Sequence, residues 1–110
     1  MDEKYRIRFF FDYGGSCFWG ADSKTTAVFE SPITPDKLPL STETIDQARD
    51  LINLFEDSLD WGNPGEGIRW NQDECDRFNT AAGLLFEEVK KELGESFELM
   101  NKQKTLKPGA

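Results

Sequence analysis

The segment FFFDYGGSCFWG, residues 9–20, brings together residue types that often do chemistry in a loop. It contains Asp12, a glycine pair, Ser16 and Cys17. A serine or cysteine nucleophile needs a general base, and histidine is the commonest one. The chain has no histidine, so either nucleophile would need a lysine or a carboxylate as an unusual partner. We therefore interpret Cys17 as a small apolar strand residue.

The glycine pair Gly14-Gly15 also has a structural explanation. A phosphate-binding loop would end in GK[ST] and lead directly into a helix, and neither feature follows here. Two glycines between strands more often supply the positive φ angles of a hairpin turn. DECD at 73–76 lacks the glycine and the spacing of a calcium loop, and the chain's two cysteines have no CxxC spacing. The sequence thus predicts no catalytic residue, no cofactor and no metal site, although carboxylates are too abundant to exclude acid–base chemistry by residue type alone.

Composition narrows the class of partner. The chain has 110 residues, enough for one domain spanning 1–110. Its 21 acidic and 13 basic residues give a net charge of −8, a field that repels nucleic acid and anionic membranes and attracts basic proteins. No apolar run reaches the roughly 20 residues needed to cross a bilayer, and the first residues do not resemble a signal peptide. We expect a cytoplasmic protein that binds neither nucleic acid nor membrane.

Periodicity and turn signals predict the elements. Apolar residues recur at helical spacing after a Ser41 or Thr42 cap, and again after Asn71, which forms a capping box with Glu74. Leu84 is interpreted as widening the second apolar stripe. The expected order is a β-hairpin at 1–22, a loop at 23–40 with room for a further strand, a helix at 41–60, a loop at 61–71, a helix at 72–94, a strand at 96–101 and a flexible tail at 102–110.

Strands at both ends and helices between them favour an α+β fold. We expect a small antiparallel sheet, formed by the N-terminal hairpin and the C-terminal strand, covered on one face by two helices. In the hairpin, Phe9 and Phe11 should point to the core, as should Cys17 and Trp19 on the return strand.

The first predicted helix has an acidic face with little basic compensation. The glycine-rich loop after it is bracketed by Trp61 and Trp70, and partly exposed tryptophans within a charged rim are typical of protein-binding surfaces. The Glu87, Glu88 and Glu92 side of the second helix competes with the first on charge alone.

Several motifs together resemble a widespread family of small acidic bacterial proteins of mostly unassigned function. They are DYGGSCFWG in the hairpin, LPLS at 38–41, SLDWGNP at 58–64, W-N-x-x-E-C-D-R-F-N at 70–79 and ELGESFEL at 92–99. The chain is also similar to the immunity proteins of polymorphic toxins, including those of contact-dependent growth inhibition. That resemblance implies binding of the C-terminal domain of a cognate toxin, and many such toxins are basic nucleases.

The leading hypothesis is a non-enzymatic immunity protein that blocks the active site of its toxin. Acidic side chains would engage the toxin's Lys and Arg, and tryptophans would fill the centre of the interface. The predicted contact set is Asp46, Asp50, Asp57, Asp60, Trp61, Glu66 and Trp70. Two alternatives stay open: an acidic regulatory or adaptor protein with another basic partner, and an enzyme that uses carboxylates or Cys17.

Overall fold

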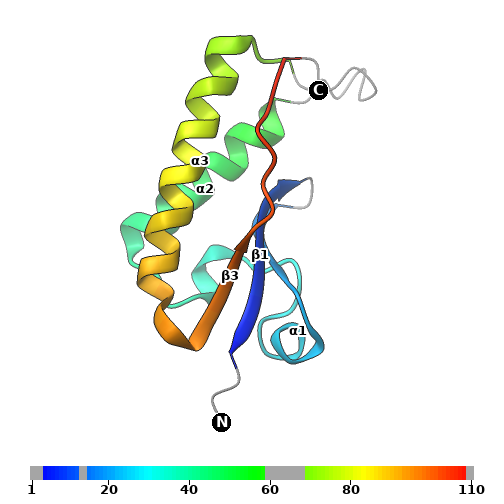
Figure 1. Cartoon of the computed structure of the whole chain (residues 1–110), viewed down its shortest axis with the longest axis vertical. Coiled ribbons are helices and arrows are strands. Elements are labelled where there is room, and N and C mark those ends of the chain that lie inside the picture. Colours follow the sequence, from blue (N-terminus) through cyan, green and yellow to red (C-terminus); the bar gives the residue numbers. More distant parts are fainter. Residues whose placement is uncertain (1–3, 13–14, 59–68, 109–110) are drawn as a thin grey trace.

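The structure is a computed structural model that describes residues 4–12, 15–58 and 69–108. Its elements are β1 (Tyr5–Asp12), β2 (Ser16–Gly20), α1 (Ser23–Phe29), the short 3₁₀ helix η1 (Pro35–Lys37), α2 (Thr42–Asp57), α3 (Gln72–Leu93), the 3₁₀ turn η3 (Gly94–Ser96) and β3 (Phe97–Asn101). A three-stranded sheet in the order β2-β1-β3 lies beside the long helices α2 and α3 (Figure 1). The α+β class expected from the sequence is confirmed.

The sheet is mixed, which corrects the expectation of an all-antiparallel sheet. β1 and β2 form the predicted antiparallel hairpin, with Phe9 opposite Phe18, and Gly15 has the positive φ of 82° that such a turn needs. β3 instead pairs in parallel with β1, with Tyr5 opposite Phe97. The direction of β3 follows from α3, which ends beside the start of β1, so the chain returns along β1 in the same sense (Figure 1).

Local capping fixes both long helices where the sequence predicts them. The Ser41 hydroxyl accepts a hydrogen bond from the Thr44 N–H at 3.2 Å at the start of α2. At the start of α3, the Glu74 N–H donates to Asn71 Oδ1 at 2.8 Å and the Asn71 N–H donates to Glu74 Oε1 at 3.1 Å, so the capping box is confirmed. Gly94, with φ of 70°, ends α3.

The segment expected to be a loop at 23–40 contains the helix α1, which the sequence did not predict. Asp22 caps it by accepting the Thr25 N–H at 2.9 Å. The helix is docked because buried Thr25 accepts the Arg6 N–H at 2.8 Å and Phe29 packs edge-on against Tyr5, with ring centroids 5.0 Å apart. The further strand left open by the sequence appears only as a single bridge between Ile33 and Phe18.

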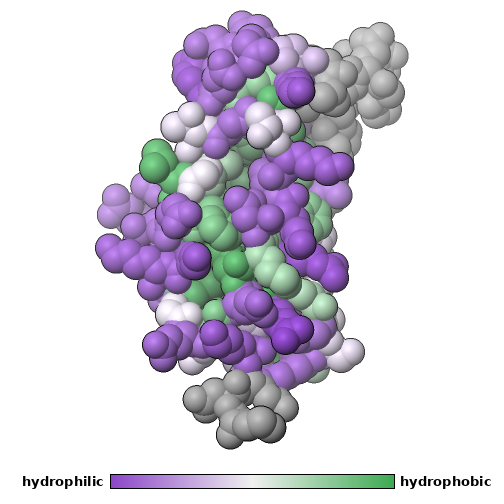
Figure 2. Space-filling view, in the orientation of Figure 1, coloured by the Kyte–Doolittle hydropathy of each residue, from purple (hydrophilic) through white to green (hydrophobic). Residues whose placement is uncertain are grey.

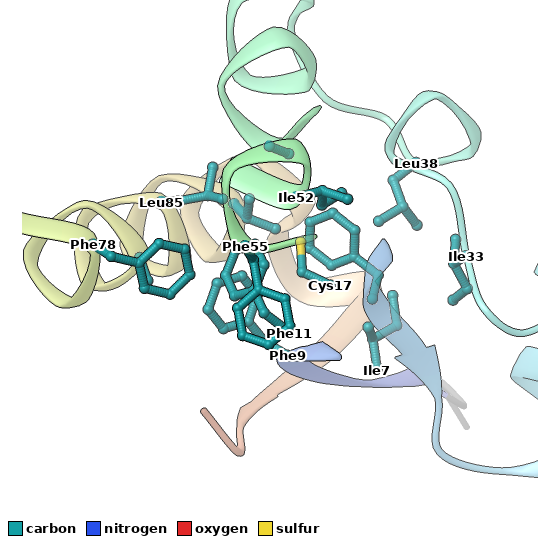
Figure 3. Close-up of a cluster of buried hydrophobic side chains, with 14 of the residues drawn as sticks. Ile7, Phe9, Phe11, Cys17, Ile33, Leu38, Ile52, Phe55, Phe78 and Leu85 are labelled. Atoms are coloured by element: carbon teal, nitrogen blue, oxygen red, sulfur yellow. The ribbon is translucent and has the colours of Figure 1, made fainter. Parts of the chain in front are cut away.

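Aromatic side chains dominate the core between the sheet and the two long helices. Figure 3 shows the rings of β1, α2 and α3 meeting: Phe9, Phe11, Phe55 and Phe78. Cys17 is fully buried among them, as expected. Figure 2 shows the surface, where hydrophilic residues cover most of the visible face and surround smaller hydrophobic areas.

Trp19 does not reach this core, contrary to expectation. It pairs with Arg8, which lies on the face of β1 opposite the buried Ile7 and Phe9. Its indole stacks on Phe10 with ring centroids 5.1 Å apart, and its Nε1–H donates to the Phe10 carbonyl at 2.9 Å. The register of the hairpin shifts between Phe9 and Asp12, so simple alternation along β2 misassigned the side chain.

The C-terminal segment, expected to be a flexible tail from residue 102, makes hydrogen bonds to the rest of the protein as far as Leu106. The Asn79 side chain donates to the Leu106 carbonyl at 3.0 Å and accepts the Leu106 N–H at 2.9 Å. Gln103 Oε1 accepts the Phe11 N–H at 2.7 Å. The Leu106 side chain also packs against the core cluster.

Candidate functional site

The predicted contact residues divide into three groups in the structure. Asp46, Asp50 and Asp57 are exposed on α2, and because they are spaced four and seven residues apart they follow one side of the helix. Asp60, Trp61 and Glu66 lie outside the described residues. Trp70 is described and is buried.

Trp70 belongs to the core, so the expectation that it is partly exposed is wrong. It is 9% exposed, and its ring centroid lies 5.1 Å from that of Phe78. It directly precedes Asn71, the N-cap of α3, and its indole packs against that helix at Phe78. Its remaining surface lines a shallow pocket with Leu51 and Leu54 of α2.

A groove with a volume of about 600 Å³ runs between α2 and α3. We call it the α2–α3 groove. Four carboxylates line it, two from each helix: Glu43, Asp50, Glu88 and Glu92. Apolar side chains line it as well: Leu51, Ala81, Leu84 and Leu85. Among the described residues that line the groove, none is a lysine or arginine.

Acidic residues from both helices therefore line one groove. The sequence left open whether a partner would use helix one or the glutamate side of helix two. The structure brings Asp50 from α2 and Glu88 and Glu92 from α3 to the same groove, while Glu87 is exposed and does not line it. This acidic groove depends on tertiary packing, because residues about forty positions apart in the sequence contribute to one surface.

Glu92 joins the two helices at one end of the groove. Its Oε1 accepts the Ser41 N–H at 2.6 Å, and its Oε2 accepts hydrogen bonds from the hydroxyls of Ser41 and Thr44. A carboxylate at the start of α2 also complements the helix dipole. Desolvation alone would raise the pKa of Glu92, but the hydrogen bonds from Ser41 and Thr44 outweigh it and hold the pKa below its ordinary value.

Glu88 lies one turn before Glu92 on α3, and its pKa is shifted in the opposite direction, above its ordinary value. A hydrogen bond with the Glu92 side chain is the largest cause of a raised pKa at Glu88, followed by desolvation. The charges of Glu92 and Glu43 add to the shift. The groove therefore gathers acidic side chains whose mutual repulsion a cation would offset.

Exposed leucines adjoin the acidic lining. Leu84 is 68% exposed, so it lies outside the core stripe to which the sequence analysis assigned it. Leu54 is 46% exposed and lines the neighbouring pocket, which shares Leu51 and Ala81 with the groove. Sequence reasoning missed Leu84 as a surface residue because it adjoins buried Leu85. Its position 100° around the helix from Leu85 was the available signal.

The groups that first suggested chemistry are committed to the core. Cys17 is fully buried, and desolvation raises the pKa of its thiol. The Ser16 hydroxyl is buried and donates to the Ile33 carbonyl. In the described ranges, no cluster of three or more His, Cys, Asp or Glu side chains could hold a metal ion, and no helix there is long and apolar enough to cross a membrane.

Comparison with known proteins shows the family to which the chain belongs. No curated protein matches the chain. The family profile described as "Serratia CdiI immunity protein-like" matches residues 5–104, which is nearly the whole sequence and includes every described helix and strand. This match confirms the resemblance to immunity proteins of contact-dependent growth inhibition. The chain belongs to the Serratia CdiI immunity protein-like family.

Proposed function

We propose that the protein is an immunity protein that binds the C-terminal toxin domain of its cognate contact-dependent growth inhibition system and neutralises it in the cytoplasm. Membership of the family, over residues 5–104, supports the toxin-immunity role. The protein acts by binding rather than by catalysis, which agrees with the burial of Ser16 and Cys17.

The α2–α3 groove is the observation that best supports this position for the interface. Its acidic lining continues onto the exposed side of α2 through Asp46 and Asp57. Aspartates along one side of the helix lie next to a groove that is lined in part by apolar side chains. Together they offer a partner both long-range attraction and a surface to desolvate. The remaining members of the predicted set, Asp60, Trp61 and Glu66, follow α2 in sequence and stay part of the proposal.

The toxin proposed for this surface is a basic nuclease. A nuclease must gather Lys and Arg around its substrate phosphates, so its active site is the most positive region of its surface. Carboxylates presented by the immunity protein compete for the same cations. Binding in this way occludes the active site and excludes the nucleic acid.

The test is co-expression of the protein with the toxin domain encoded beside it. We expect the toxin domain alone to arrest growth, and co-expression to restore growth and to yield a complex that co-purifies. Purified complex should no longer degrade DNA or RNA. A complex without growth rescue would favour an adaptor role, and the absence of both rescue and complex would rule out the proposed function.

A further inference from the structure

We infer that the α2–α3 groove receives an amphipathic basic segment of the toxin, in which an apolar side chain contacts Leu84 and Leu51 and flanking Lys or Arg side chains face the four groove carboxylates. This inference rests on the proposed function and specifies the chemistry of the partner at that site.

Apolar side chains of the groove lie at the protein surface. Three large hydrophobic side chains are exposed in the described parts of the chain: Val28, Leu54 and Leu84. Single exposed leucines are ordinary, but Leu54 and Leu84 both border the same continuous surface, with half-buried Leu51 between their two pockets. A contiguous apolar surface rimmed by charge is typical of a protein-binding site.

The carboxylates of the groove favour a partner segment with positive charge. Glu43 and Asp50 come from one wall, Glu88 and Glu92 from the other, and no described lining residue offsets them. Glu92 is held in place by hydrogen bonds from Ser41 and Thr44, so part of the negative charge is fixed before a partner arrives. An acidic or neutral segment would leave these carboxylates to be desolvated without compensation.

The dimensions of the groove indicate how much of the partner it can hold. Its lining extends from Glu43 to Leu51 on α2 and from Ala81 to Glu92 on α3. At 1.5 Å per residue these stretches cover about 12 Å and about 17 Å. That length matches two to three turns of a helix laid between α2 and α3, a common way for a groove to recognise an amphipathic segment.

The apolar contact is tested by measuring the Kd of one variant and of a matched control for the purified toxin domain. Leu84→Gln removes the apolar contact without adding charge and keeps a good helix former. Val28→Gln makes the same kind of change at a 56% exposed site on α1, outside the groove. We expect Leu84→Gln to raise Kd about tenfold or more by faster dissociation, as loss of an interface anchor does, and Val28→Gln to leave Kd within about twofold.

The charge component is tested with Glu43→Gln/Glu88→Gln, which should weaken the dependence of Kd on salt, whereas Leu84→Gln should leave that dependence unchanged. Thermal unfolding of each variant checks that the fold is kept. If Leu84→Gln binds like the wild type, or if the charge variant keeps the full salt dependence, the inferred occupant is wrong while the immunity role stands. If the wild-type protein itself neither binds nor protects, the proposed function fails instead.

Discussion

Reversing two aspartates on α2, Asp50→Lys with Asp57→Lys, is expected to slow association with the toxin domain about 10-fold to 100-fold at low salt, because electrostatic steering acts mainly on the association rate. The double change moves the net charge from −8 to −4, since each reversal adds two charges. Asp50 lines the groove and Asp57 is exposed on the same side of α2. Stopped-flow or surface-based kinetics at several salt concentrations measures the effect.

The matched control is Glu87→Lys with Glu95→Lys. It produces the same change in net charge at two exposed residues that do not line the groove. We expect a much smaller decrease in the association rate than for the α2 pair, and a nearly wild-type dissociation rate. Equal slowing by both pairs would show that net charge alone steers the toxin, and would contradict the placement of the interface at α2.

Replacing Trp70 with alanine is expected to lower the free energy of unfolding by about 3–5 kcal/mol, the usual loss for a large aromatic removed from a core. Trp70 is 9% exposed and packs against Phe78. Trp19→Ala provides the control, because its indole is only half-buried and stacks on Phe10 at the opposite face of the sheet. The control should lose about 1–2 kcal/mol, and urea unfolding at constant pH measures both.

Trp70→Phe separates a core role from the interface role that the sequence suggested. A phenylalanine keeps much of the packing, so the variant should fold, unfold at a lower urea concentration than the wild type, and bind the toxin domain with Kd within about twofold of wild type. The contrary result would be wild-type stability with a Kd raised about tenfold or more, since that pattern marks a direct contact.

The parts of the fold that sequence predicts well are those with local causes. Asn71 and Glu74 satisfy each other's backbone groups within four residues, and the stripe from Cys75 to Leu93 repeats at helical spacing, so α3 could be located without tertiary information. Helix α1 could not be, because its seven residues carry little apolar pattern. It is held by non-local contacts such as the hydrogen bond from the Arg6 N–H to Thr25.

The candidate site was predictable only in part, for the same reason. The acidic side of α2 follows from the spacing of Asp46, Asp50 and Asp57. The meeting of Asp50 with Glu88 and Glu92 depends on how α2 and α3 pack, which no local pattern specifies. Burial of Trp70 and exposure of Leu84 are likewise outcomes of packing. From residue type alone, the tryptophan is expected at the interface and the leucine in the core, and the structure shows the reverse.

Amide hydrogen exchange of the protein, measured with and without the purified toxin domain, would show whether the toxin domain binds at the α2–α3 groove. We expect slower exchange on binding in α2, in the 81–92 stretch of α3 and around the Ser41 cap, with little change in β2 and α1. Slower exchange confined to the sheet, with α2 and α3 unchanged, would contradict it.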